Sequence, residues 1–261
     1  MTVPRNTAII VKEEEDEKPR DPTCKTALEN EIVSTITLSH EVWQETRFHE
    51  WYLPKEFSQG QLNGNRGSTA CTVIAAEMCS KILLGQADVS FLSSASTQPR
   101  TEVLNNFVRV MRSGNSRYES VGGMPKLGLL GIDQVLNLFP DLLLEIKPRL
   151  DLGFFDRQHI QDRFSVFLKD LMKPSTMSSS SVEAAVFIRT PYSACMVFHK
   201  GRMGIFDSHS HGPNRGALIG IGSEHLTPYL AAEYVASYIE RHYGLRSKAT
   251  GCQVCFLQLS V

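Results

Sequence analysis

Four short apolar segments between residues 184 and 222 constrain the fold of this chain more than any other feature of its sequence. They are rich in Val, Ile and Phe, and turn-forming residues separate them. Short segments of this kind are typical of consecutive antiparallel strands. We therefore predict four strands of one sheet: AAVFIRT (184–190), SACMVFHK (193–200), RMGIFDSHS (202–210) and GALIGIG (216–222).

A helix and a last strand complete this half of the chain. Residues 227–243 have an amphipathic pattern, with Thr227 as N-cap, Pro228 at the first helical position and Gly244 at the end. The apolar segment CQVCFLQLSV (252–261) predicts a strand.

The first half of the chain has apolar residues at helical spacing instead. The fold class that follows is α+β, with a helical lobe and an antiparallel sheet. The predicted helical regions are 29–57, 71–84, 101–112, 127–139 and 158–172, and the predicted loops between them are 57–69, 113–125 and 147–156.

The helix at 71–84 begins with a cysteine. Ser68 or Thr69 is available as its N-cap, and Gly85 ends it. A thiol in the first turn of a helix lies at the positive end of the helix dipole, which favours the thiolate. Small residues before Cys71 would let a substrate backbone approach, and the backbone N–H of Cys71 would be available to an oxyanion. On its own, the segment also fits a buried structural thiol.

Polar residues gather where the strand at 202–210 ends. Asp207 and His209 are two positions apart, so on a strand they project from the same face. The carboxylate can then hold one imidazole nitrogen while the other faces a thiol. A helix cysteine with Asp-x-His on a distant strand is the nucleophile, orienter and base arrangement of cysteine hydrolases. Either Gln59 or Gln61, both upstream of the cysteine, is available as a side-chain donor for the oxyanion hole.

Other interpretations of these residues are open. Asp207, His209 and His211 also suit zinc, because an H-x-H pair stands beside a carboxylate. No second ligand cluster accompanies them, so we expect no metal and no cofactor, and His211 is expected to line the cleft as a loop residue. Cys252 and Cys255 form a C-x-x-C pair within an apolar strand, and we expect both in the core.

Composition limits the partners and the compartment. The 27 Lys and Arg residues balance 28 Asp and Glu residues without clustering, so we expect no nucleic-acid partner. No apolar run approaches the roughly 20 residues that span a bilayer, and the N-terminus is not a secretory signal. We therefore expect no membrane partner and a cytoplasmic or nuclear location. The scattered cysteines suit reduced thiols, with Cys79 in the core: Cys24, Cys71, Cys79, Cys195, Cys252 and Cys255.

The first residues differ from the rest. Residues 1–28 include EEEDEKPRDP (13–22) and have too few apolar side chains to offset the entropy of ordering, so we predict a disordered acidic tail before a single domain at 29–261. Within residues 9–16, an aliphatic triplet precedes a Lys and four acids, which resembles a SUMO-acceptor or SUMO-interacting segment. A solvated run of charges is the plainer interpretation of this segment.

Two motifs carry a family resemblance. GNRGSTAC (64–71) resembles the G-x-R-x-G-S-x-C segment of the herpesviral large tegument protein deubiquitinases and their cellular and bacterial relatives. FDSHSHG (206–212) resembles the F-D-x-H-x motif of the same group. The resemblance spans roughly residues 57 to 260. It implies a papain-like cysteine protease fold.

The resemblance also implies an activity and a site. The activity is hydrolysis of the isopeptide bond after the C-terminal Gly-Gly of ubiquitin, with ubiquitin or polyubiquitin chains as substrate. Cys71 would be the nucleophile, His209 the general base, Asp207 its orienter and an upstream Gln the oxyanion donor. Two features depart from the family: both candidate glutamines lie closer to the cysteine, and a Ser follows the base where many relatives have an aromatic residue.

Two other functions stay open. The chain could be a non-catalytic module that binds ubiquitin or another protein, or a cysteine protease for another ubiquitin-like modifier. The presence of all three catalytic residue types in order argues for activity. The helices between 86 and 172 are expected to contact the globular surface of the substrate.

Overall fold

The computed structural model describes most of the chain from residue 37 onwards. The described ranges are 37–43, 45, 47–62, 68–93, 98–122, 128–154, 157–172, 182–224, 226–244 and 251–260. The predicted acidic tail, with the segment 9–16 inside it, lies outside the described residues, as do residues 64–67 of the first motif.

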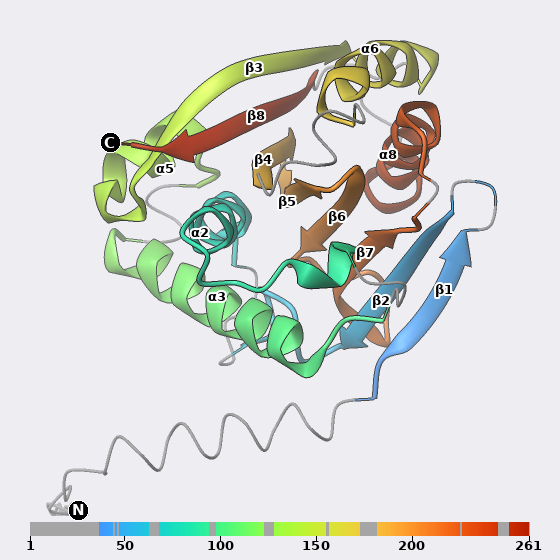
Figure 1. Ribbon diagram of the computed structural model, residues 1–261. Coiled ribbons are helices and arrows are strands. Elements are labelled where there is room, and N and C mark those ends of the chain that lie inside the picture. Colours follow the sequence, from blue (N-terminus) through green and yellow to red (C-terminus); the bar gives the residue numbers. More distant parts are fainter. Residues whose placement is uncertain are drawn as a thin grey trace, which may run out of the picture.

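One antiparallel sheet of eight strands runs through the middle of the described structure (Figure 1). Its strand order is β1-β2-β7-β6-β5-β4-β8-β3, so strands that are distant in the sequence lie side by side. The strands are β1 (Ser39–Trp43), β2 (Phe48–Pro54), β3 (Leu144–Phe154), β4 (Val182–Arg189), β5 (Tyr192–His199), β6 (Arg202–Asp207), β7 (Arg215–Gly222) and β8 (Gly251–Leu259).

Helices cover both faces of this sheet (Figure 1). On one face α2 packs against β4 and β5 and against α3, and on the other α6 packs against α8. The described helices are α2 (Cys71–Leu83), α3 (Thr101–Ser120), α5 (Ile132–Leu138), α6 (Arg157–Leu171) and α8 (Pro228–Tyr243), with short 3-10 helices η2 (Ser90–Ser93) and η3 (Pro140–Leu142).

Each face of the sheet has its own apolar core, because successive side chains of a strand point to opposite faces. Val186 and Cys195 belong to the core beneath α2 and α3, whereas their neighbours Phe187 and Met196 belong to the core beneath α6 and α8. The central strands are therefore buried on both sides, as the all-buried β6 shows. This explains their continuous apolar sequences and confirms the α+β class.

The predicted second half of the fold is confirmed. The four strands between 184 and 222 are β4 to β7, the amphipathic segment is α8, and the last apolar segment is β8. The N-cap prediction also holds, because Oγ1 of Thr227 accepts a 3.2 Å hydrogen bond from the backbone N–H of Leu230.

The helical prediction for residues 29–57 was wrong, because the described residues of this range that have regular secondary structure are in strands. They form the hairpin β1–β2 at one edge of the sheet. The inward-facing residues of β2 include Phe48, Glu50 and Tyr52, all buried. The sequence does not show this alternation of inward and outward residues as an apolar–polar pattern, because one of the inward residues is a charged glutamate.

The loop predicted at residues 147–156 was also wrong over its described part, because β3 continues to Phe154 and pairs with β8. β3 is an edge strand, where a sheet tolerates charged residues and proline such as Lys147 and Pro148.

The start of α2 differs from the prediction as well. The N-cap is Ala70, without a side-chain cap, instead of Ser68 or Thr69. Ser68 donates through Oγ to Asn115 Oδ1 (2.6 Å), and Oγ1 of Thr69 hydrogen bonds with the hydroxyl of Tyr118 (2.7 Å). Both hydroxyls thus tie the segment before Cys71 to α3.

The helix predicted at 101–112 is longer in the structure, since α3 extends to Ser120. Gly114, in the segment predicted to be a loop, lies inside the helix. A Cβ placed there would be 2.6 Å from Cγ1 of Ile74, so the glycine lets α3 approach α2 closely.

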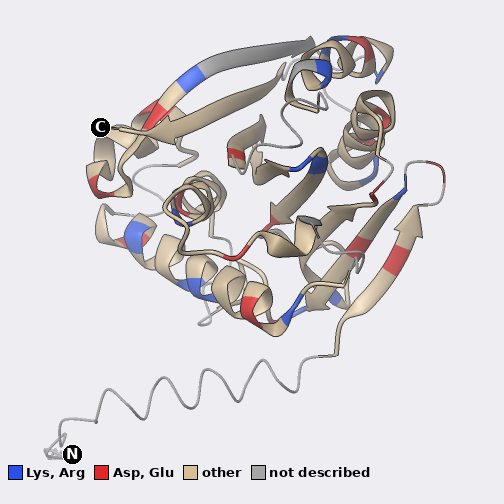
Figure 2. Ribbon diagram, viewed as in Figure 1, with Lys and Arg blue, Asp and Glu red and all other residues tan. Residues whose placement is uncertain are grey.

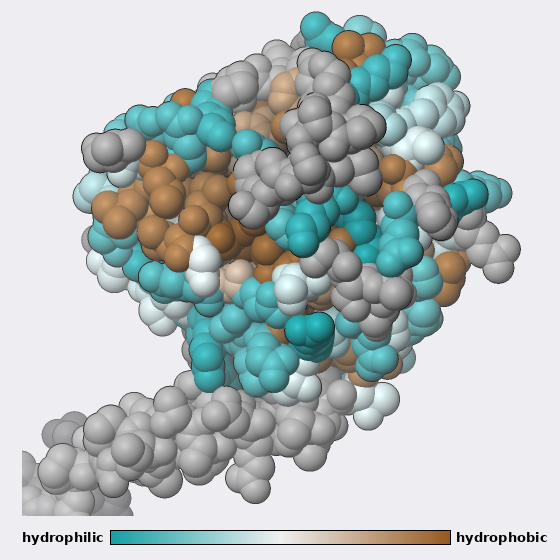
Figure 3. Space-filling model, viewed as in Figure 1, coloured by the Kyte–Doolittle hydropathy of each residue, from teal (hydrophilic) through white to brown (hydrophobic). Residues whose placement is uncertain are grey.

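The surface carries both charged and apolar regions. Acidic and basic residues are interspersed along the elements in the view of Figure 2. Apolar side chains gather on the face over α2 and α5 (Figure 3). We define the apolar patch by Leu84, Leu138 and Leu143, which are 37%, 41% and 47% exposed. No helix among the described residues is long and apolar enough to cross a membrane.

Candidate active site

Cys71 is the first residue of α2, which the chain reaches from the edge hairpin. Its side chain is buried, with only 2% of the residue exposed, and its thiol donates to the carbonyl oxygen of Pro191 at 3.5 Å. The first N–H groups of a helix have no partner within it. The thiol therefore lies where unpaired donors and the helix dipole favour negative charge.

Asp207 and His209 meet at the end of β6. Nδ1 of His209 lies 2.5 Å from Oδ1 of Asp207, and the backbone N–H of His209 donates to the same oxygen at 3.0 Å. The expectation that both residues lie on one strand face was wrong, because β6 ends at Asp207. The tight turn closed by the aspartate side chain aligns the imidazole instead.

Cys71, His209 and Asp207 interact electrostatically and shift one another's pKa values. Burial opposes ionisation of the Cys71 thiol, but the hydrogen bond and charge of His209 hold the pKa of Cys71 below its ordinary value. Burial likewise opposes the charged imidazole, yet Asp207 and then Cys71 raise the pKa of His209 to about 10. The arrangement favours a thiolate beside an imidazolium.

The second oxygen of Asp207 is held from α8. Tyr243 donates to Oδ2 at 2.6 Å, and the hydroxyl of Tyr238 donates to the same atom. Burial and the charge of Asp207 raise the pKa of both tyrosines, so they stay neutral donors. Burial alone would raise the pKa of Asp207, but His209 and His211 hold it well below the ordinary value. The carboxylate is thus charged and fixed at both oxygens.

His211 is not a cleft residue, so that expectation was wrong. Its side chain is 2% exposed, and its Nε2 lies 3.0 Å from Oδ2 of Asp207. The loop after β6 folds back through the hydrogen bond from the His211 backbone N–H to the carbonyl of Arg215 (3.1 Å), which turns the imidazole inward.

The two candidate glutamines lie in different surroundings. Oε1 of Gln59 accepts from Ser208 Oγ at 2.8 Å, and its Nε2 donates to the carbonyl of Ser68 at 3.1 Å. These contacts aim the amide NH2 at the segment that leads into Cys71 and leave it a second hydrogen to donate. Gln61 is exposed. The geometry therefore favours Gln59 as the side-chain donor.

Two polar residues near this site were not predicted from the sequence. Asn115 of α3 is 1% exposed, and its Nδ2 donates to the carbonyl of Gln59 at 3.0 Å. Ser193 of β5 helps lower the pKa of Cys71 by hydrogen bonding and lies 2.9 Å from Oγ1 of Thr72. Asn115 lies in a segment predicted to be a loop and Ser193 in one predicted to be a strand, so no sequence signal marks either as a residue of the site.

A small pocket lies beside the thiol. Its volume is about 130 Å³, and Thr72, Pro191, Tyr192 and Ser193 are among its lining residues. The ring of Tyr192 stacks on Tyr243 at 4.4 Å and meets the edge of the imidazole of His209 at 5.0 Å. Aromatic side chains therefore form one wall next to the base.

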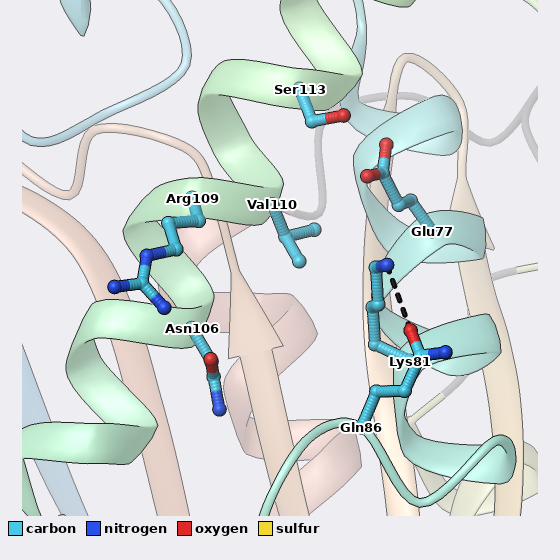
Figure 4. Close-up of a pocket in the computed structure, with 7 residues that line it drawn as sticks. All are labelled: Glu77, Lys81, Gln86, Asn106, Arg109, Val110 and Ser113. Atoms are coloured by element: carbon cyan, nitrogen blue, oxygen red, sulfur yellow. Dashed lines mark hydrogen bonds between the residues drawn. The ribbon is translucent and has the colours of Figure 1, made fainter. Parts of the chain in front are cut away.

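A larger pocket, of about 370 Å³, lies between α2 and α3 (Figure 4). Glu77 and Lys81 line it from α2, and Arg109 and Ser113 line it from α3. None of the predicted site residues belongs to it. The larger pocket therefore lies apart from the candidate site of Cys71 and His209.

The other cysteines that the sequence analysis placed in the core are buried in the structure. Cys79, Cys252 and Cys255 are all buried with 0% exposure, as expected for core residues. In the described part of the chain, His, Cys, Asp and Glu side chains form no group of three or more that could hold a metal ion.

Comparison with known proteins gives a distant structural likeness. No protein-family model and no curated protein matches the sequence. Among solved structures, the chain is similar to the ubiquitin-specific protease encoded by murine cytomegalovirus tegument protein M48, solved in complex with a ubiquitin-based suicide substrate. The similarity covers 78% of this chain and 84% of that chain, at 9% identity and a TM-score of 0.42. At this level the likeness is too distant to assign a family.

Proposed function

We propose that the chain is a papain-like cysteine protease that hydrolyses the isopeptide bond after the C-terminal Gly-Gly of ubiquitin. The observation that carries the proposal is the contact of Cys71, at the start of a helix, with His209, which Asp207 holds at 2.5 Å. A buried thiol that served only the core would have no need of an adjacent imidazole and buried carboxylate.

The chemistry follows from this geometry. The Cys71 thiolate attacks the carbonyl carbon of the terminal glycine, and the carbonyl oxygen becomes an oxyanion near the helix start and the amide of Gln59. His209 gives its proton to the departing lysine nitrogen, which leaves a thioester on Sγ. His209 then takes a proton from water, the hydroxide attacks the thioester, and the carboxylic acid product and free thiol are released. No cofactor is required.

The proposal that ubiquitin is the substrate rests on the two sequence motifs at 64–71 and 206–212. The apolar patch of Leu84, Leu138 and Leu143 offers a surface for the folded part of this substrate, since exposed patches of this kind often contact partners. Leu138→Asp should therefore raise KM while leaving kcat unchanged. We also propose that the protein is located in the cytoplasm or the nucleus.

Turnover of a ubiquitin joined by an isopeptide bond to a fluorescent lysine peptide tests the proposal. Wild type should cleave it, and Cys71→Ser should not. His209→Ala should lose several orders of magnitude in kcat/KM, and Asp207→Ala less, because the orienter can be partly replaced. Cys79→Ala, which removes another buried thiol of α2, is the matched control and should keep its activity.

The alternatives give different results in this assay. Binding of ubiquitin without turnover would support a non-catalytic module and contradict the hydrolase. Cleavage of SUMO or NEDD8 reporters instead of the ubiquitin reporter would keep the chemistry and overturn the substrate. Activity that a chelator abolishes and iodoacetamide spares would indicate metal chemistry and exclude the thiol mechanism.

A further inference from the structure

Asn115 of α3 is a buried polar residue to which the mechanism described above gives no role. Only 1% of it is exposed. Asparagine is unfavourable in the interior of a helix, and so is the glycine that precedes it. Gly114 lets α3 approach Ile74 of α2 closely. The side chain of Asn115 reaches the loop between β2 and α2, where its Nδ2 contacts Gln59.

The two ends of the Asn115 amide bind different segments. Nδ2 donates to the backbone carbonyl of Gln59 at 3.0 Å, and Oδ1 accepts from Oγ of Ser68 at 2.6 Å. These partners determine the orientation of the amide, because only its NH2 end can donate to a carbonyl oxygen. Asn115 therefore joins the loop that carries Gln59 to the segment that leads into Cys71.

Gln59 itself is held at four groups. Its backbone N–H donates to the carbonyl of Ser208 at 2.8 Å, and its backbone carbonyl accepts from Asn115. In its side chain, Oε1 accepts from Oγ of Ser208 at 2.8 Å, and Nε2 donates to the carbonyl of Ser68 at 3.1 Å. Ser208 directly precedes His209. Three segments thus determine where the amide lies, and one hydrogen of Nε2 is left to donate.

This fixing is what an oxyanion donor requires. A donor stabilises an oxyanion best when it is held in place before the charge develops. Loops are more mobile than the elements that they connect, so a donor on a loop needs partners from rigid elements. Helix α3 supplies one partner through Asn115, and the end of β6 supplies another through Ser208.

We propose that Asn115 is a positioning residue for the oxyanion hole. Its Nδ2 holds the carbonyl of Gln59 and its Oδ1 holds the hydroxyl of Ser68, so that the side-chain amide of Gln59 stays beside the start of α2. The role rests on the proposed function and on Gln59 as the oxyanion donor. Asn115 touches no reacting atom in this proposal, so its effect on turnover passes through Gln59.

A double-mutant cycle on the ubiquitin reporter tests the role. Asn115→Ala should lower kcat about tenfold, the rate equivalent of one buried hydrogen bond, with KM within about twofold of wild type. Gln59→Ala should lower kcat roughly 100-fold. The double variant should match Gln59→Ala, because the two residues act as one unit. Asn106→Ala is the matched control, since it removes an amide of the same helix that lines the pocket of Figure 4, and it should keep wild-type kcat.

Alkylation of Cys71 by iodoacetamide separates oxyanion stabilisation from thiolate reactivity, because this reaction forms no oxyanion. The alkylation rate of Asn115→Ala should stay within about twofold of wild type while its kcat falls. An alkylation rate that falls as much as kcat would overturn the proposal. Equal kcat for Asn115→Ala and Asn106→Ala would overturn it too, as would additive losses of roughly 1,000-fold in the double variant.

Hydrogen exchange of side-chain amides tests the geometry without substrate, in the full chain with Cys71→Ala and nitrogen-15 labelling. The Nε2 hydrogens of Gln59 should exchange more slowly than those of the exposed Gln61. Ser68→Ala, which removes only the hydroxyl partner of Asn115, should speed exchange at Gln59. Equal exchange at the two glutamines, or exchange at Gln59 that Ser68→Ala leaves unchanged, would overturn the proposal even if no Asn115 variant folded.

These measurements separate the possible failures. If wild type does not cleave ubiquitin at all, the proposed function fails, while the exchange rates still decide whether Asn115 and Ser68 hold Gln59 in place. If wild type cleaves ubiquitin and Gln59→Ala keeps wild-type kcat, Gln59 is not the oxyanion donor, and the positioning role of Asn115 fails with it.

Discussion

The hydroxyl of Tyr243 donates a 2.6 Å hydrogen bond to Oδ2 of Asp207, so the last residue of α8 is tied to the last residue of β6. This bond links the helix that covers one face of the sheet to the strand end that presents the candidate base. The candidate nucleophile, Cys71, comes from the opposite face, on α2. The site therefore depends on both helical layers being packed against the same sheet.

Tyr243→Phe should lower kcat/KM by roughly threefold to tenfold, because it removes one buried donor from the aspartate and leaves the packing of the ring intact. Without that donor the pKa of Asp207 rises and its hold on His209 weakens. Tyr229→Phe on the same helix, at a residue that is 58% exposed, is the control. Identical steady-state kinetics for the two variants would contradict a role for this hydrogen bond.

The two glutamines should behave differently. Gln59→Ala should lower kcat by roughly 100-fold, as loss of an oxyanion donor does, with a smaller change in KM. Gln61→Ala should stay within about twofold, as expected for an exposed side chain. Melting temperatures measured alongside separate lost catalysis from lost stability. A larger kcat loss for the Gln61 variant would reverse the assignment.

Activity should persist to high pH. The imidazolium of His209 has a raised pKa of about 10, and the thiol of Cys71 has a lowered one, so the ion pair exists between the two values. Activity should be lost as pH rises through about 10, where His209 gives up its proton. Asp207→Asn should move this limit to lower pH. The test is the pH profile of kcat/KM, and an alkaline limit near the ordinary histidine value of 6.5 would contradict the account.

The same shift contributes to stability. Because the pKa of His209 is raised on folding, the contribution is complete below the ordinary value of 6.5 and is lost as pH rises through about 10. Asp207 has the opposite dependence, since its pKa is lowered, and its contribution disappears as pH falls below its ordinary range. Denaturant titrations of wild type across pH would follow both losses.

Gly114→Ala should destabilise the packing of α3 on α2 by about 1 to 3 kcal/mol, because the new methyl group would lie 2.6 Å from Cγ1 and 3.0 Å from Cα of Ile74. Gly131→Ala is the matched control, since the nearest atom to its methyl group would be 3.7 Å away. Urea unfolding of both variants provides the measurement. A Gly114 variant as stable as the Gly131 variant would show that the helices have room to move apart.

The strands at the centre of the sheet could be predicted from the sequence because both of their faces are buried, which makes their segments continuously apolar. The edge strands could not. In β2 the buried Glu50 interrupts the apolar alternation, and its charge is balanced only by partners from distant elements such as Arg241. In β3, Pro148 is a residue type that favours loops, and the strand accommodates it at the sheet edge, where the pairing with β8 shifts register.

The candidate site likewise contains residues that the sequence predicts and residues that it does not. Cys71, Asp207 and His209 could be found because their types and spacing suggest a known chemistry. The position of His211 was predicted wrongly, because its inward orientation depends on the backbone hydrogen bond to Arg215 and on His242, which is distant in the sequence. Asn115 contacts Gln59 only through the packing of α3 against the segment before α2, which no local pattern reports.

The central claim is that Cys71 is the nucleophile that attacks the C-terminus of ubiquitin. Its most direct test is reaction of the purified chain with ubiquitin that carries an electrophile at its C-terminus, followed by intact mass and peptide mapping. The account predicts a single covalent adduct on Cys71 that is absent from Cys71→Ala. No adduct with wild type, or an adduct that persists in Cys71→Ala on another cysteine, would contradict it.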